Sequence, residues 1–312
     1  FASLSVNERD FILEALKSDF RIDARGLTDV RPIQAKFGTA TNKNGQVLLS
    51  YGKTKVLTQT HLKLSSPQPG RPQEGFLKFN ADFDSLNHMA EFTNQTSTVQ
   101  EMKIEIQSFI DKVIRNSRAT DKEGLCIISG KLVWSVTVQM HLLNDDGNLF
   151  DAFFLAAVLA LKNTRIPEVT LASNKIRIND DKQKFLNVHH LPVATTFYFL
   201  QGQDQKPIVD VNSKEERLCD ARLTIVMNSY EDICGISSLG ALNLGATQQQ
   251  AESEDSEDED MSEAIATAGV DHATLFECMD QALVRAKQIT TLVRSTWETR
   301  NDHFSILDIK SQ

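Results

Sequence analysis

The sequence has few of the residues that hold small secreted domains together. Its four cysteines lie far apart, form no Cys-x-x-Cys pair and have no histidine at metal-ligand spacing. This spacing argues against a disulfide framework and a zinc site, so we expect reduced thiols, a reducing compartment and no bound metal or cofactor. No apolar run approaches the roughly 20 residues of a membrane span, and the first residues lack a signal-peptide pattern. We therefore expect neither secretion nor a membrane partner.

Basic residues are also in the minority, with 33 Lys and Arg against 42 Asp and Glu and a net charge of −9. Phosphate binding depends on clustered cations, so this balance by itself argues against a nucleic-acid partner. Eight of the acids, however, stand between residues 252 and 263, and removing them from the −9 leaves −1. The remainder of the chain is nearly neutral and can carry local basic patches.

Residues 247–263 form a low-complexity acidic segment. The segment has too few apolar side chains to offset the entropy lost on ordering, so we expect a disordered linker. Ser256, with Glu259 three residues later, resembles a site for an acidophilic kinase, although a solvated linker is the simpler interpretation.

Hydrophobic periodicity in the first half of the chain changes between two and about 3.6 residues. Residues 132–143 alternate apolar and polar side chains and predict a strand with one buried face. Residues 150–161 are almost wholly apolar and predict a buried helix. The other expected elements are a helix over 7–20 that begins at Asn7, strands over 33–40, 46–51, 54–64 and 76–83, and a helix over 96–118.

The second half repeats the order of strands followed by a helix. We expect strands over 169–178, 191–200, 207–211, 221–228 and 231–237, and a long helix near 270–298. Strands that precede helices in both halves favour an α+β architecture with mixed sheets. The expected organisation is an N-terminal helical arm over 1–27, a first subdomain over 28–167, a second over 168–246, the acidic linker over 247–263, and a C-terminal helix and tail over 264–312.

Five stretches carry a resemblance to a known family. They are Arg21–Gly26 with Arg31 and Pro32, Tyr51–Leu57, His141–Asn148, Val188–Pro192 and Cys219–Ile225. Together these stretches resemble the RNase PH family, and more closely the catalytically silent ring subunits of the eukaryotic RNA exosome. The resemblance runs from about Asn7 to Leu239.

This resemblance implies the RNase PH fold, in which two αβ subdomains have mixed sheets packed on helices. It implies a ring of six such subunits around a channel for single-stranded RNA, in which this chain pairs with RNase PH-like sister subunits. The further implied partners are cap subunits with S1 and KH domains and hydrolytic exosome nucleases. The implied role is 3′–5′ RNA processing and decay, including rRNA processing and mRNA decay, in the nucleus with its nucleolus and in the cytoplasm.

The phosphate site of the family is degenerate in this sequence. Phosphorolysis needs a cation and backbone N–H donors that hold phosphate, and a carboxylate that assists the leaving oxygen or holds a metal. Active relatives read Gly-Gly-Thr-Arg-Thr-Ala after the long strand, whereas this chain has Asn148, Leu149, Phe150 and Asp151 within the matching segment. Phe150 replaces the phosphate-binding Arg and Asp151 adds an anion, which should repel phosphate. Thr98 stands where the second phosphate Arg is expected.

The carboxylate pair of the family is also incomplete. Asp210 matches the first acidic position, but the second falls on Arg222, and Asp220 lies two residues away, about 7 Å along a strand. We therefore expect no catalytic residues and a non-catalytic ring subunit. Two alternatives remain: an active phosphate-dependent 3′–5′ exoribonuclease, and a free nucleic-acid-binding module outside any ring.

The best candidates for RNA contact are Lys112, Arg115 and Arg118, at the end of the first long helix, with Lys122 just beyond. Their spacing of three residues projects them in neighbouring directions, which suits consecutive phosphates. A solvated helix end, where cations favour the helix dipole, explains the same pattern. The resemblance favours RNA, because it implies that the positions of Lys112 and Arg115 face RNA.

Two further groups of cations are ambiguous. Arg71 and Lys78 flank a Pro- and Gly-containing loop over 65–75, which could face a channel or merely connect strands. Arg25 could contact a partner or RNA, but an ion pair with Asp23 explains it equally well.

Overall fold

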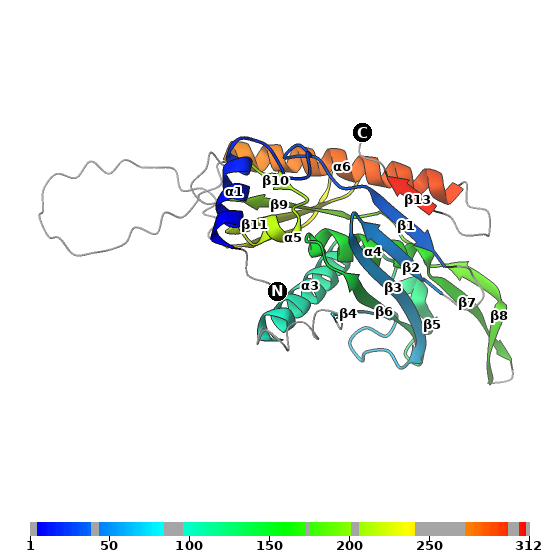
Figure 1. Ribbon diagram of the computed structural model, residues 1–312. Helices are drawn as coiled ribbons and strands as arrows, with labels where there is room; N and C mark the ends of the chain where they lie inside the picture. The colour runs from blue at the N-terminus through cyan, green and yellow to red at the C-terminus, as the bar shows by residue number, and fades with distance from the viewer. Residues whose placement is uncertain are drawn as a thin grey trace, which may run out of the picture.

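The computed structural model describes residues 5–38, 44–83, 96–172, 175–200, 206–240, 272–298 and 306–309. The acidic segment over 247–263, with Ser256, lies outside these residues. Two large sheets lie beside each other, and helix α6 (His272–Glu298) runs along both (Figure 1). No helix in the described ranges is long and apolar enough to cross a membrane.

The first sheet is a mixed sheet whose strand order is β13-β1-β2-β3-β6-β4, with β5 paired to β6. Its long strand β6 (Leu132–Asn144) has the alternating burial that its sequence predicts, and it pairs antiparallel with β3 and parallel with β4. The other strands are β1 (Ile33–Phe37), β2 (Val47–Tyr51), β3 (Thr54–Ser65), β4 (Phe76–Asp82), β5 (Cys126–Ile128) and β13 (Ile306–Ile309). The strands expected over 33–40, 46–51 and 54–64 are confirmed and pair in chain order as antiparallel neighbours.

The second sheet is antiparallel, with the order β10-β9-β11-β12. Its strands are β9 (Val193–Phe199), β10 (Ile208–Val209), β11 (Ala221–Met227) and β12 (Ile233–Leu239). All seven residues of β9 are buried, because α4 and α6 both pack against this strand. After α6, β13 pairs with β1 of the first sheet, so the C-terminal segment joins the two halves of the fold.

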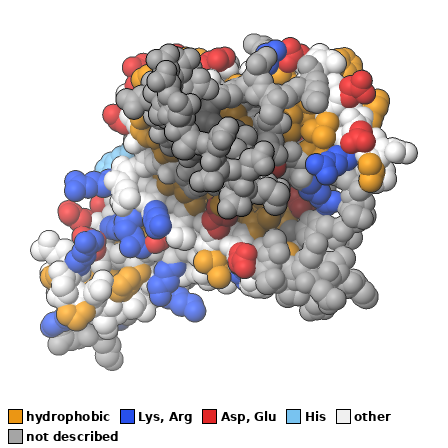
Figure 2. Space-filling view, turned by 90° about the vertical axis from the view of Figure 1, so that its left-hand side faces the viewer, with side chains coloured by type: hydrophobic (Ala, Val, Ile, Leu, Met, Phe, Trp, Pro, Cys, Tyr) orange, Lys and Arg blue, Asp and Glu red, His pale blue; other side chains and the backbone are white. Residues whose placement is uncertain are grey.

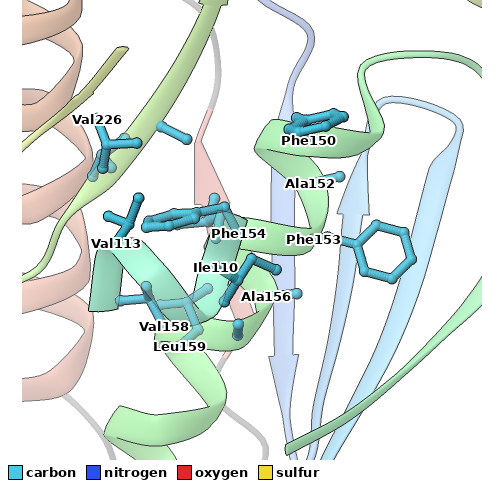
Figure 3. Close-up of a cluster of buried hydrophobic side chains, with 14 of the residues drawn as sticks. Ile110, Val113, Phe150, Ala152, Phe153, Phe154, Ala156, Val158, Leu159 and Val226 are labelled. Carbon is cyan, nitrogen blue, oxygen red and sulfur yellow. The ribbon is translucent and has the colours of Figure 1, made fainter. Parts of the chain in front are cut away.

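Helix α4 (Leu149–Asn163) is the central element of the core, as its apolar sequence predicts. Figure 3 shows Phe154 turned toward Val113 of α3 (Thr96–Asn116) and Val226 of β11, while Phe153 turns toward the strands of the first sheet. Apolar side chains all round a helix are stable only where protein covers every side. The burial of α4 therefore fixes how the two sheets sit relative to each other.

Helix α1 (Val6–Lys17) begins one residue before the expected Asn7, because the Ser5 hydroxyl caps it by accepting the Glu8 N–H at 3.3 Å. Its Ile12 and Leu16 are buried in a small cluster with side chains of the second sheet. Helix α5 (Ser213–Glu216) is a single turn that the sequence did not reveal.

The strand expected over 169–178 is wrong as a single element. Residues in this region form a hairpin of β7 (Arg165–Ala172) and β8 (Lys175–Phe185), with Ala172 paired to Lys175. Periodicity of two continues through both strands and does not mark the reversal, whereas Ser173 and Asn174 are residue types that favour a turn. The hairpin projects from the body of the molecule (Figure 1).

Candidate functional site

The segment that leads into α4 is shaped by two residues with left-handed backbone conformations. Gly147 has φ 81°, and a Cβ there would lie 2.6 Å from the backbone N of Ser213. Asn148 has φ 53° and does not cap the helix with its side chain. Instead its Nδ2 donates to Asp151 and to Asp210, each at 3.0 Å. The start of α4 is thus closed by groups of the protein itself.

Asp210, the carboxylate that the sequence assigns to the first acidic position, is completely enclosed. Arg31 donates to it from its backbone N at 2.6 Å and from Nη2 at 2.7 Å, and Arg25 donates from Nη1 at 3.0 Å. Burial alone raises the pKa of Asp210, but the hydrogen bonds and charge of Arg31, with help from Asn148, outweigh it and leave the pKa below its ordinary value. Asp210 therefore serves as an internal counter-ion with no oxygen left for a substrate.

Arg25 also forms an ion pair with Asp23 at 2.6 Å. The ion-pairing interpretation of Arg25 is therefore confirmed.

Asp151 is turned into the core. Its oxygens accept from the hydroxyl of Thr196 at 2.7 Å and from the backbone N of Thr196 at 3.2 Å. Burial raises the pKa of Asp151 above its ordinary value, against the opposing charge of the buried Arg285 and these hydrogen bonds. Asp151 is therefore not an open anion at the start of α4, where the sequence predicted a charge that repels phosphate.

Phe150 and Arg222 are in direct contact. The guanidinium carbon of Arg222 lies 3.7 Å from the centroid of the Phe150 ring, and its Nη2 donates to Glu105 of α3 at 2.7 Å. Phe150 is buried, and Arg222 is largely covered. The two residues that the sequence predicts in place of the family's Arg and carboxylate therefore meet in a cation–π contact.

Glu216 is the carboxylate that the sequence reasoning overlooked. Its Oε2 accepts the backbone N–H of Asn148 at 3.3 Å, and its Oε1 accepts from the hydroxyl of Tyr198 at 3.1 Å. Burial, with the nearby charge of Asp145, raises the pKa of Glu216 above its ordinary value. The capping box between Asn212 and Glu215 was the available signal, because it predicts the turn that carries Glu216.

Asp220 is exposed in the turn before β11, where its backbone N donates to Phe199 at 3.1 Å. Around the start of α4, the cations Arg25, Arg31 and Arg222 are all paired with carboxylates. No group of His, Cys, Asp and Glu within the described residues could hold a metal ion. A phosphate at the start of α4 would therefore have to compete with these carboxylates for each of the three cations.

The three predicted RNA-contact residues all lie on the surface at the end of α3. Lys112, Arg115 and Arg118 are exposed, and Arg115 forms an ion pair with Asp111 on its own helix. Arg118 has φ 52° just after the helix ends. No ion pair of Lys112 or Arg118 is found among the described residues. Their spacing is as predicted, and their contact with RNA stays a prediction.

The loop over 65–75 comes close to this helix end. The backbone N of Gly75 donates to the carbonyl of Lys122 at 3.0 Å, and the charges of Arg115 and Arg71 both act on Lys122. Burial and these neighbouring cations lower the pKa of Lys122. Arg71 itself pairs with Glu74 at 3.1 Å. The structure thus brings together cations that are distant in sequence.

On the face that carries α1, Lys and Arg side chains gather toward the lower left, with Asp and Glu among them (Figure 2).

The fold has two αβ subdomains whose sheets pack on a shared buried helix, with a closed turn at the start of that helix. This arrangement is that of an RNase PH-type fold. Comparison with known families agrees. Residues 29–167 match the model of the 3′ exoribonuclease family, domain 1, and residues 190–285 match domain 2 of the same family. The chain belongs to this family.

Among curated proteins, the chain is similar to Exosome complex component RRP45 of Rattus norvegicus, with 36% identity over 244 residues. This match covers 77% of the chain but 54% of the relative, so the chain spans about half the length of that protein. It is also similar to Exosome complex component RRP45A of Arabidopsis thaliana, with 31% identity over 98% of the chain and 91% of the relative.

Among solved structures, the chain is similar to a subunit of the Archaeoglobus fulgidus exosome with RNA bound to the active site. The identity is 25% and the TM-score is 0.68, over 90% of this chain and 95% of that one.

Proposed function

We propose that this chain is a non-catalytic subunit of an RNA exosome ring. In this role it pairs with an RNase PH-like sister subunit and helps to line a channel for single-stranded RNA during 3′–5′ processing and decay. The proposal is supported by relatives that are named as exosome components over nearly the whole chain, and by a similar structure that contains RNA.

The contact between Phe150 and Arg222 is the single observation that carries the non-catalytic part. In phosphorolysis, the cation that holds phosphate must be open to it, and a carboxylate must lie nearby. Here an aromatic ring fills the first position, and the guanidinium at the second lies 3.7 Å from that ring. Glu216 remains as a carboxylate, but its two oxygens accept hydrogen bonds from Asn148 and Tyr198.

The same proposal includes the wider assembly. Cap subunits with S1 and KH domains and hydrolytic nucleases are the partners that an inactive ring would need, because a ring without phosphorolysis must deliver RNA to an enzyme elsewhere. We place the protein in the nucleus, including the nucleolus, and in the cytoplasm, where such RNA processing and decay take place.

Two measurements test the proposal. The chain is co-expressed with RNase PH-like exosome subunits, and the mass of the purified assembly is determined; a stable monomer that recovers none of them would overturn the ring assignment. The purified chain is then incubated with labelled RNA and inorganic phosphate, with an active archaeal exosome as the positive control. Release of nucleoside diphosphates by the chain alone would instead support the alternative of an active exoribonuclease.

A further inference from the structure

A group of aromatic and basic side chains lies at the root of the β7–β8 hairpin. The ring of Phe185 on β8 lies 5.6 Å from the ring of Trp297 at the end of α6. Arg165 on β7 lies over Phe185 at 4.6 Å, and Lys162 of α4 lies over Trp297 at 5.3 Å. Arg294 is exposed one turn before Trp297. We call these five residues the hairpin-root cluster.

The hairpin-root cluster is held on rigid elements. The backbone of Arg165 is fixed from both sides by Asn44, whose Oδ1 accepts its N–H at 2.7 Å and whose Nδ2 donates to its carbonyl at 2.6 Å. The backbone of Leu186 donates to Thr164 at 2.8 Å, which ties the other strand of the hairpin to the end of α4. The cluster is therefore preorganised.

The cations of this cluster have no partner of opposite charge among the side chains that the structure describes. Within the described part of the chain, ion pairs occur elsewhere, but none involves Lys162, Arg165 or Arg294. Burial and the charge of Arg294 lower the pKa of Lys162. Three neighbouring cations without an acid are unexpected in a chain with 42 acidic and 33 basic residues. Their repulsion is best offset by an external polyanion.

The aromatic residues indicate which polyanion. The side chain of Phe185 is 45% exposed although it packs on Trp297, so an apolar ring is held at the surface beside guanidinium groups. Aromatic rings on which bases stack, set among Lys and Arg that contact phosphates, are typical of sites for single-stranded nucleic acid. A protein surface that carries only acidic side chains would form ion pairs with the cations but would leave the exposed ring without a stacking partner.

We propose that the hairpin-root cluster binds single-stranded RNA, with a base stacked on Phe185 and phosphates held by Lys162, Arg165 and Arg294. This inference rests on the proposed function only in its choice of RNA as the ligand. The cluster contains neither Lys112 nor Arg115, but the two groups lie on adjoining segments, because the backbone N of Asp121 after α3 donates to the carbonyl of Asn187 after β8 at 3.2 Å.

The test measures binding of the full chain to a short fluorescein-labelled oligouridine by fluorescence anisotropy at several salt concentrations. Phe185→Leu keeps an apolar contact to Trp297 but removes the ring, and it should weaken binding at least about fivefold. Phe185→Tyr keeps the ring and should bind as the wild type does. Removing two phosphate contacts with Arg165→Gln and Arg294→Gln should reduce the salt slope by about 1.4, at about 0.7 per contact.

The matched control is Lys184→Gln, which removes one charge from the opposite face of the same hairpin, because neighbouring residues of a strand alternate faces. It should change the affinity far less than Arg165→Gln. The thermal midpoint of each variant reports whether it is folded. Wild-type protein that does not bind oligouridine, or Phe185→Leu that binds as the wild type does, would overturn the inference.

The same variants are also assembled with the exosome subunits. Variants that bind oligouridine normally but fail to enter the assembly would show that the cluster contacts protein, which also overturns the inference. Failure of the wild-type chain to assemble speaks against the proposed function alone, because the oligouridine measurement does not depend on a ring.

Discussion

The guanidinium of Arg222 stacks on the ring of Phe150, with the guanidinium carbon 3.7 Å from the ring centroid. The sequence predicts that each of these residues stands at a position where an active member of the family has a different group. Because Phe150 is buried and Arg222 is mostly covered, the contact joins the start of α4 to the start of β11.

The stacking of Arg222 on Phe150 should be measurable as a coupling energy. Phe150→Leu keeps an apolar side chain without the aromatic face, and Arg222→Met keeps the length of the side chain without its charge. A double-mutant cycle on the free energy of unfolding in urea should give a coupling of about 0.5–2 kcal/mol. Single effects that simply add, within about 0.3 kcal/mol, would show that the two residues are independent.

The enclosed carboxylate of Asp210 should make the free energy of unfolding depend on pH in the acidic range. Its folded pKa lies below the ordinary value, so it contributes stability above about pH 4, and this contribution is lost as the pH falls through its folded pKa. Asp210→Asn should cost about 3–5 kcal/mol at neutral pH, because it leaves buried Arg31 without its counter-ion. The cost should shrink as the pH falls below about 4, because the carboxyl of the unfolded wild-type chain is protonated first and that of the folded protein only at its lower pKa.

Urea unfolding across pH 3–7 measures the dependence on Asp210. Asp280→Asn, at an exposed position on α6, is the control and should change the free energy of unfolding by less than about 0.5 kcal/mol. A cost for Asp210→Asn that stays constant with pH would contradict the assigned ion pairs.

Gly147 should be irreplaceable for a reason beyond its positive φ. Gly130 has a similar φ of 74° but open space around it, whereas a Cβ at Gly147 would lie 2.6 Å from backbone at Ser213. Gly130→Ala therefore reports the cost of the left-handed conformation alone. Gly147→Ala should be less stable than Gly130→Ala by about a further 1–3 kcal/mol, because the backbone at Ser213 must move. Equal thermal destabilisation of the two variants would refute the close approach.

Charge reversal at the end of α3 should weaken RNA passage through an assembled ring without dissociating it. Lys112→Glu with Arg115→Glu replaces two exposed cations, and the crosslinking of RNA to reconstituted rings should fall. Lys206→Glu with Lys214→Glu makes the same change in charge at two exposed lysines near α5 and is the control. Undiminished crosslinks in rings of normal mass would argue against an RNA role for Lys112 and Arg115.

Local sequence predicts the elements of this fold well where one pattern dominates. The alternation over β6 and the apolar run of α4 determine their own structure, because each requires a specific pattern of burial. The β7–β8 hairpin was missed because period two is the same before and after a reversal. The short helix α5, and with it Glu216, was missed because a single capped turn is too short to show a helical period.

The sequence by itself determined which side chains stand at positions 150 and 222, and from their identity it predicted that Phe150 and Arg222 replace the groups needed for phosphorolysis. Only the tertiary structure decided that Arg222 meets Phe150 and Glu105, and that Arg31 and Arg25 enclose Asp210. The same holds for Phe185 and Trp297, which lie on separate elements and meet at the root of the hairpin. These contacts join residues far apart in the chain. They form because both sheets and α6 pack around the buried helix α4.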